Sequence, residues 1–275
     1  MFIRLSALSA LHIAFVSIIP VTAHSYSQLI DGRSAGLAGM GVMLYGNESI
    51  FSNQAGLSRQ QRKGVGMHYQ NPFMLTQTGT KAVHCVIPSP SGVWAANLSY
   101  FGYAKYNITK TSLAFAKNLA NTVSAGIQLN HHNMFIADDY GHSNKISAEA
   151  GLIASPAKNI FIGFHVFNPW QSMHQARHSE LTATITKIGF AWKISDSYLL
   201  SEVITEQRKS TICIVGIEHC VTKNFFLRAG LSPNLSSYAF GIGYKTAGIH
   251  TNIAFMSQQP LGFTPHLSLS YAPEK

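Results

Sequence analysis

The feature that most constrains the fold is a regular alternation of apolar with polar or small residues, in segments that suit a transmembrane β-strand of about 9–11 residues. The alternation runs from about Gly64 to Tyr271, and Gly, Pro, Asn, Ser or Asp separate the segments. Successive side chains of a strand point to opposite faces. The pattern therefore predicts strands with one apolar face and one polar or small face, as in Val123, Ala125, Ile127 and Leu129 against Ser124, Gly126, Gln128 and Asn130.

About fourteen strands are predicted, which is an even number, as is typical of a single-chain outer-membrane barrel. The first is short and the second alternates weakly, so twelve strands is the alternative. The predicted strands are 64–70, 80–88, 92–103, 106–117, 121–133, 145–155, 159–168, 181–193, 197–206, 209–220, 224–232, 236–246, 248–257 and 262–272.

Composition favours a barrel in lipid over a soluble β-sandwich, which also has many short alternating strands. Only 11% of the residues are charged, against about 25% in soluble domains, so lipid is expected to cover part of the surface. Aromatic residues near strand ends match the girdles of such a barrel. They are Trp94, Tyr103, Trp170, Trp192, Tyr198 and Tyr271.

The connections predict an orientation for the barrel. If the amino terminus is periplasmic, one set of turns is short: 88–91, 117–120, 155–158, 194–197, 221–224 and 246–248. The other set includes the two longest predicted loops, Met134–Asn144 and Pro169–Glu180. Short periplasmic turns and longer outer loops are typical of outer-membrane barrels.

The first 23 residues have the three parts of a secretory signal peptide. Arg4 precedes an apolar run from Leu5 to Val21, and Val21-Thr22-Ala23 is a small-x-small cleavage site. The alternative, an uncleaved anchor, is disfavoured by polar residues and Pro20 within the run. The predicted organisation is a signal peptide (1–23), a plug segment (24–62) and a barrel (63–275) in the outer membrane of a Gram-negative bacterium.

The net charge of +9 does not predict a nucleic-acid partner, because Lys and Arg are scattered singly along the chain. Arg59 to Lys63 is the only basic cluster. Cys85, Cys213 and Cys220 are too few and too irregularly spaced for a disulfide framework or a zinc site. At most one pair of them could form a disulfide.

The plug segment is rich in small residues, which let backbone approach backbone. We expect it to fold inside the barrel. Its glycines do not form a nucleotide-binding loop, because neither G-x-G-x-x-G nor a Walker lysine is present. The motif residues that we assign to the structure of the plug are Gly32, Gly36, Gly39, Gly41, Asn53, Ala55, Gly56 and Leu57.

At these residues the chain resembles the FadL-like outer-membrane barrels, and within them the group that contains the PorV and PorQ proteins of type IX secretion. Those proteins have a Gly/Ala-rich segment, an acidic residue before an aromatic, and Asn-Pro-Ala-Gly-Leu. Here Glu48 precedes Phe51, and Asn53–Leu57 reads Asn-Gln-Ala-Gly-Leu, with Gln54 in place of proline. The resemblance implies fourteen strands and continues through 150–163, 227–232, 240–244 and 261–262.

No catalytic constellation, metal site or cofactor is predicted, since neither G-x-S-x-G nor H-E-x-x-H is present. His131 and His132 with Asp138 and Asp139 suggest a metal site, but adjacent strand residues face opposite sides. A solvated outer loop is the better interpretation. Polar residues predicted to face the lumen either fill it or bind a ligand head group: Gln128, Asn130, His132, Glu149, His165, Glu218, Arg228, Asn252 and His266.

Two non-enzymatic functions follow from the resemblance. The first is an accessory of type IX secretion or surface attachment, whose partners are secretion-system proteins. The alternative is a FadL-like channel that takes up hydrophobic small molecules such as fatty acids and releases them sideways through the wall. A hydrolase built on a barrel is a third and weaker hypothesis. Outer-membrane lipid is the expected surrounding in every case.

Overall fold

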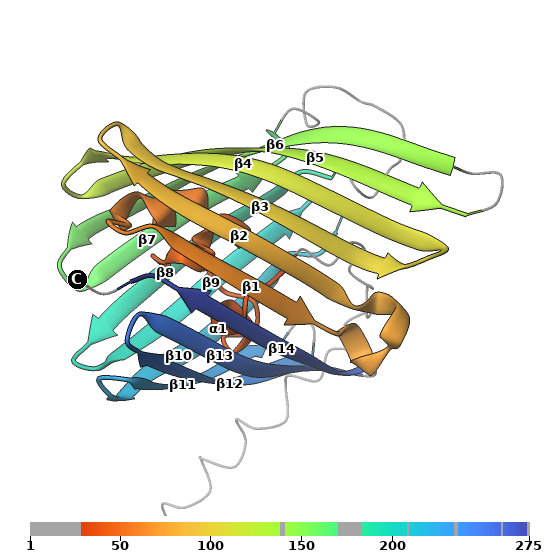
Figure 1. The fold of residues 1–275 in the computed structure, drawn as a ribbon. Coiled ribbons are helices and arrows are strands. Elements are labelled where there is room, and N and C mark those ends of the chain that lie inside the picture. Colours follow the sequence, from red (N-terminus) through yellow and green to blue (C-terminus); the bar gives the residue numbers. More distant parts are fainter. Residues whose placement is uncertain are drawn as a thin grey trace, which may run out of the picture.

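The computed structural model describes residues 29–137, 141–169, 183–207, 209–233, 236–259 and 261–273. The predicted signal peptide and its cleavage site lie outside these residues. The described strands form one closed antiparallel barrel in which every strand pairs with its neighbours in sequence and β1 pairs with β14 (Figure 1). The predicted fold class is therefore confirmed, with fourteen strands rather than twelve.

The strands follow the predicted segments closely. Even the seven-residue β1 pairs along its length with both β2 and β14, which closes the barrel. The strands are β1 (Gly64–Gln70), β2 (Thr80–Ser89), β3 (Gly92–Tyr103), β4 (Tyr106–Ala120), β5 (Val123–Ile136), β6 (Gly141–Ala157), β7 (Ile160–Phe167), β8 (Ile185–Ile194), β9 (Ser197–Glu206), β10 (Ile212–Thr222), β11 (Phe225–Ser232), β12 (Ser237–Thr246), β13 (Ile249–Gln258) and β14 (Gly262–Tyr271).

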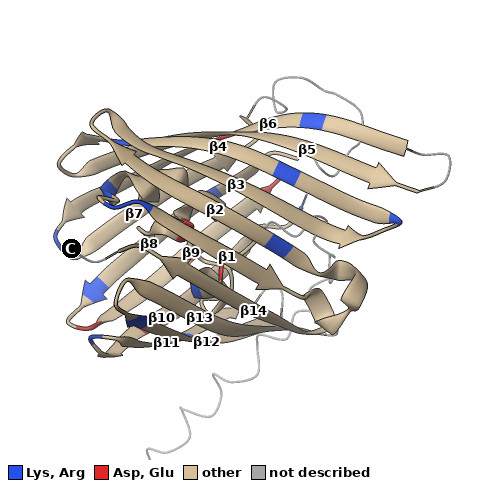
Figure 2. Ribbon diagram, viewed as in Figure 1, with Lys and Arg blue, Asp and Glu red and all other residues tan. Residues whose placement is uncertain are grey.

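The outer face of the wall is apolar, whereas the inner face carries polar and small residues together with the apolar residues that pack against the plug. In β5, Ile127 and Leu129 are 61% and 62% exposed, whereas Gln128 and Asn130 are 1% exposed. Every strand contributes exposed large hydrophobic residues. Figure 2 shows long stretches of the wall without Lys, Arg, Asp or Glu. An outer face of this kind is typical of a barrel in lipid.

The two ends of the barrel differ as expected. At one end, six two-residue turns join the strands, at 90–91, 121–122, 158–159, 195–196, 223–224 and 247–248. We call this the turn end. We call the other end the loop end. There, residues 71–79 form a loop that contains η3 (Pro72–Met74) and η4 (Thr76–Thr78). The connection between β7, which ends at Phe167, and β8, which begins at Ile185, is also at this end.

Three predicted connections are wrong. Residues 155–157 of the predicted turn 155–158 belong to β6. Most of Met134–Asn144 is strand, because Met134 pairs with Ser143 and Ile136 with Gly141. Residues 117–120 likewise belong to β4, with a bulge between Asn118 and Ala120. Backbone hydrogen bonds need no apolar side chains, so the ladders continue beyond the alternating segments.

Three of the six predicted girdle residues point outward and are 44–46% exposed: Trp94, Trp192 and Tyr271. Tyr103 is 44% exposed at the loop-side end of β3, but it shares the odd parity of the inward residues Asn97 and Ser99. Tyr198 was assigned wrongly. Its side chain lies inside the barrel against Phe161 and the apolar core, because β9 has even-numbered residues such as Leu200 and Glu202 on its inner face. Trp170 lies outside the described residues.

The described part of the plug segment lies inside the barrel (Figure 1). It forms three short helices, α1 (Gly32–Ala35), η1 (Asn47–Phe51) and η2 (Gln54–Arg59). Asp31 caps α1 by accepting hydrogen bonds from the backbone N–H groups of Arg33 and Ser34. Among the described residues, no helix has the length and apolar character needed to cross a membrane.

Two apolar clusters join the plug to opposite parts of the wall. In the first, Leu37, Met40, Val42 and neighbouring plug residues pack against inward residues of β8 to β12. In the second, Ile50 and Leu57 pack against β2, β3 and β4. The core of this protein is therefore the interface between the plug and the wall.

Candidate functional site

The plug lies directly against a row of glycines in the wall, which we call the glycine belt. The plug backbone contacts four of them, Gly126, Gly163, Gly230 and Gly241, and plug side chains contact the others. A Cβ built on Gly126 would lie 2.5 Å from the carbonyl carbon of Gln54, and one on Gly241 would lie 2.7 Å from the Cα of Gly36. A real Cβ atom does not approach other atoms so closely. The plug can therefore dock here only because the wall has no side chain at these positions. The belt consists of Gly126, Gly151, Gly163, Gly189, Gly216, Gly230 and Gly241.

The predicted glycines of the plug have different surroundings. Gly32 lies against Asn252 and Ser268 of the wall, and Gly36 lies against Gly241. Gly41 is enclosed by Ser34 and Ser52, and Gly56 by Leu44 and Ser49. These four are buried. Close approach, rather than flexibility, accounts for the absence of a side chain at these positions.

Gly39 differs from the other predicted glycines. It is partly exposed, and its nearest neighbour is the Cδ1 of Ile30, 3.6 Å from the position of a Cβ. Its φ of +95° is a conformation that L side chains rarely adopt. A positive φ, and not crowding, therefore explains this glycine.

Asn53 ties the plug to the wall through its side-chain amide. Its Nδ2 donates to the backbone oxygens of Val42 at 2.6 Å, Leu152 at 3.2 Å and Phe164 at 3.2 Å. Its Oδ1 accepts from the backbone N–H of Ala55 at 3.1 Å. One side chain therefore joins two parts of the plug to β6 and β7.

Gln54, which departs from the proline of the resembling motif, makes a contact that proline could not make. Its Nε2 donates to Glu149 at 2.8 Å, and the same carboxylate contacts Lys110 and His165 at 3.1 Å each. The next residues of the motif are also part of the contact between plug and wall. Ala55 lies against Gly126, and Leu57 is fully buried.

Two further wall carboxylates bind the plug. Glu218 of β10 accepts from Arg33 at 2.6 and 2.9 Å and from Arg228 at 2.6 Å. Burial alone would lower the pKa of Arg33, but Glu218, with Glu48 and Asp31, raises it above its ordinary value. Glu202 of β9 accepts from the backbone N–H groups of Gly41 and Val42 at 2.9 and 3.1 Å.

The structure confirms the inward positions of the nine polar residues predicted to face the lumen, all of which are buried. Glu202 and the glycine belt were not recognised as contacts of the plug. Glycine at inward positions of neighbouring strands was a usable signal for the belt. The alternation in β9 did not indicate that Glu202 faces the plug, because the apolar residues Leu200 and Ile204 lie on the same face.

The suggested metal site is not formed by the described residues. His132 is buried and lies 3.0 Å from the Oγ of Ser147, whereas His131 faces outward. Asp138 and Asp139 lie outside the described residues. Within the described part of the chain, no group of three His, Cys, Asp or Glu side chains is arranged to hold a metal ion.

An apolar cavity of about 270 Å³ lies between the plug and the loop end of the barrel. Its polar lining includes Gln70, Lys187, Glu206 and His266, from the loop-side ends of their strands. Aliphatic side chains from the plug and from β8, β9, β10 and β13 form much of the remainder: Ile30, Ala38, Ile185, Ile204, Ile212, Ile214 and Met256. We call it the outer cavity.

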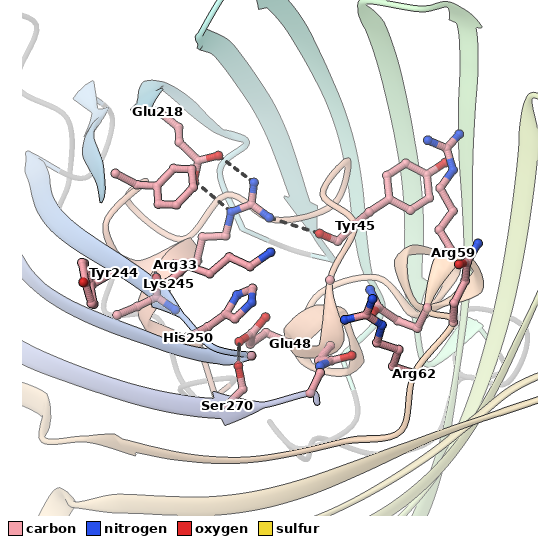
Figure 3. Close-up of a pocket in the computed structure, with 18 of the residues that line it drawn as sticks. Arg33, Tyr45, Glu48, Arg59, Arg62, Glu218, Tyr244, Lys245, His250 and Ser270 are labelled. Carbon is pink, nitrogen blue, oxygen red and sulfur yellow. Dashed lines mark hydrogen bonds and ion pairs between the residues drawn. The ribbon is translucent and has the colours of Figure 1, made fainter. Parts of the chain in front are cut away.

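A second cavity of about 460 Å³, the inner cavity, lies at the turn end. Figure 3 shows Arg33, Lys245 and His250 on one side of it and Arg59 and Arg62 on the other, with Glu48 between them. Arg33 lines the inner cavity, whereas Asp31 and Ser34 line the outer one. The segment around α1 therefore separates the two cavities.

No protein-family model and no curated protein matches the sequence. Solved structures do resemble the fold. A FadL homologue of Pseudomonas aeruginosa aligns with a TM-score of 0.61 and 11% identity over 88% of this chain and 98% of that one. The toluene transporter TbuX of Ralstonia pickettii aligns at 0.61 and 9% over 89% and 97%. The toluene transporter TodX of Pseudomonas putida aligns at 0.61 and 10% over 90% and 99%.

The closed wall of fourteen strands, the apolar outer face and the docked plug give this chain the fold of the FadL-like outer-membrane β-barrels. The expected location, the Gram-negative outer membrane, agrees with this fold. At about a tenth identity, the likeness concerns the fold and not the ligand.

Proposed function

We propose that the protein is a channel for small hydrophobic molecules, with the outer cavity as their binding site. The observation that carries this proposal is the aliphatic lining of that cavity at the loop end, which faces the cell exterior in barrels with this asymmetry. A volume of about 270 Å³ suits a single small ring, since a cavity of roughly 150 Å³ in another protein holds benzene.

Three similar structures support this choice over a secretion role. TbuX and TodX are described as toluene transporters, and CymD as a monoaromatic hydrocarbon channel. The accessory role in type IX secretion rests on the sequence resemblance alone, which centres on the Gly/Ala-rich segment, Glu48 before Phe51, and Asn53–Leu57. Docking against the wall already accounts for these residues. Co-purification of secretion components with the native barrel would favour that role instead.

The experiment measures uptake of radiolabelled toluene by cells that lack their own hydrocarbon channels and express this protein. Ile212→Trp fills the outer cavity, and we expect it to abolish the protein-dependent uptake. Ile217→Trp is the matched control, because Ile217 lies on the lipid-facing side of the same strand and is 41% exposed. Uptake by Ile212→Trp equal to wild type, with normal assembly of both variants, would exclude the outer cavity from the route.

A further inference from the structure

The inner cavity carries an excess of positive charge. Five cationic side chains line it, Arg33, Arg59, Arg62, Arg228 and Lys245, against two carboxylates, Glu48 and Glu218. With His250 neutral, three positive charges are left over. Burial alone would raise the pKa of Glu48, but the hydrogen bond from Ser270, with His68 and His84, lowers it below its ordinary value.

One carboxylate cannot neutralise two guanidinium groups. Glu218 lies between Arg33 and Arg228 and accepts from both. Arg228 also donates to the Oδ1 of Asn252 at 2.9 Å, which is a neutral acceptor. Of the carboxylates, Glu218 alone makes hydrogen bonds to this pair of guanidinium groups, so one positive charge of the trio has no carboxylate of its own in direct contact.

The remaining cations are held in place by neutral groups. The guanidinium of Arg59 lies 3.9 Å from the ring centre of Tyr45 and donates to Ser155 at 3.0 Å. Arg62 donates through Nη1 to the backbone oxygen of Pro273 at 3.0 Å. A guanidinium has five N–H donors, so both residues keep donors for a ligand. Because the two guanidinium groups are already held in position, the entropic cost of binding a ligand is lower.

Lys245 adds a charge from the wall. It lies on β12 at the same inward parity as Gly241 and Gly243, and Figure 3 shows it beside Arg33 and His250. Among the described residues, it makes no ion pair with a carboxylate. Lys245 therefore offers an uncompensated ammonium group to the cavity.

We propose that the inner cavity binds a small soluble oxyanion with at least two negative charges, of the phosphate or polycarboxylate class. Arginine forks match the paired oxygens of both groups. A volume of about 460 Å³ is in the range of small-molecule sites. Arg59, Gln61 and Lys245 are exposed at the turn end, which admits a ligand from the periplasmic side.

The test is calorimetric titration of the full-length barrel in non-ionic detergent, with tripolyphosphate, citrate, inorganic phosphate and nitrate as separate probes. We expect saturable binding of one tripolyphosphate or citrate per barrel, weaker binding of phosphate and no binding of nitrate. Because the cavity is open to solvent, affinity should fall as KCl is raised. Lack of saturable binding by any multivalent probe would overturn the proposal.

Variants locate the site. Arg62→Gln with Lys245→Gln should weaken binding by about tenfold or more, since charged hydrogen bonds are lost. Lys245→Gln alone should weaken it severalfold and breaks no described contact. Lys158→Gln, in a turn at the same end, removes one charge without touching the cavity and should bind as wild type. Equal weakening by Lys158→Gln would show general attraction to a basic protein and reject the site. Toluene uptake is a separate readout, so either proposal can fail alone.

Discussion

At the residue scale, a few side chains hold the plug, and each acts through a different kind of contact. Asn53 bonds to backbone oxygens of two wall strands, Glu202 accepts from two plug N–H groups, and Glu218 pairs with Arg33. Such contacts are costly to break singly, because the partner that remains is buried and unsatisfied.

Glu218→Gln should loosen the plug, since it leaves the guanidiniums of Arg33 and Arg228 without their common carboxylate. Breaking a buried ion pair costs about 3–5 kcal/mol. Limited proteolysis of the purified barrel should therefore cut residues 29–62 faster than in wild type. Glu202→Gln is the control, because its amide oxygen can still accept from Gly41 and Val42. Unchanged cutting in Glu218→Gln would mean that the apolar clusters alone retain the plug.

Gly39→Val should also undock the plug, although Gly39 has room around it. A branched side chain at a φ of +95° is strained, at a cost of about 1–2 kcal/mol or more. Proteolysis of residues 29–62 is again the measurement. Because strain arises from the backbone, Gly39→Ala should show part of the same effect. Protection equal to wild type in both variants would show that this turn contributes nothing to docking.

At the element scale, each strand has two faces with different contacts, because successive residues point alternately outward and inward. The outer face meets lipid through large apolar residues, whereas the inner face carries glycine and apolar residues where the plug packs, together with many buried polar residues. The belt extends from β5 to β12, and the second apolar cluster joins the plug to β2, β3 and β4.

Gly163→Ala should displace the plug and leave the wall intact. Its Cβ would collide with the backbone oxygen of Val42, and overpacking of this kind costs about 1–3 kcal/mol. Faster proteolysis of the plug, with unchanged heat-modifiable migration of the barrel, is expected. Ala150→Val on the lipid face of β6 adds more volume and should have no effect. Equal behaviour of the two variants would contradict the close approach at the belt.

Leu129→Arg tests the other face. Leu129 is 62% exposed on the outside of β5, and arginine facing mid-bilayer lipid costs roughly 2–4 kcal/mol. The midpoint of urea unfolding in lipid vesicles should fall accordingly, whereas Leu129→Met should leave it unchanged. A midpoint for Leu129→Arg within error of wild type would mean that this position is not in contact with lipid.

At the scale of the whole molecule, we expect the wall to form without the plug. The ladder from β1 to β14 satisfies the strand backbones without help from the plug. The plug instead divides the lumen into an apolar outer cavity and a cationic inner one.

Deletion of residues 31–59 should therefore leave a barrel that still inserts and still migrates with heat-modifiable mobility. Its lumen is polar on the inner face, so it should fill with water and conduct ions. Single-channel conductance in a planar bilayer is the measurement, with the full-length protein as the reference. A deletion variant that fails to insert would show that the plug is part of the folding core of the wall.

The wall could be predicted from the amino-acid sequence. Alternation with a period of two is a local property, so the strands, their inward residues and the short turns could be predicted before any long-range contact was known. Strand ends were predicted less well, because β5 and β6 continue through hydrogen bonds that leave no mark on side-chain pattern.

The fit between the plug and the wall could not be predicted in this way, because it depends on long-range contacts. Glu218 lies 185 residues from Arg33, and Phe164 lies 111 residues from Asn53. Contacts over such separations leave no periodic signal in one chain. Both cavities depend on them, because each is enclosed by plug residues on one side and by several strands on the other. Alternation along the strands predicts a barrel, but the shape of the cavities inside it depends on how the plug packs against the wall.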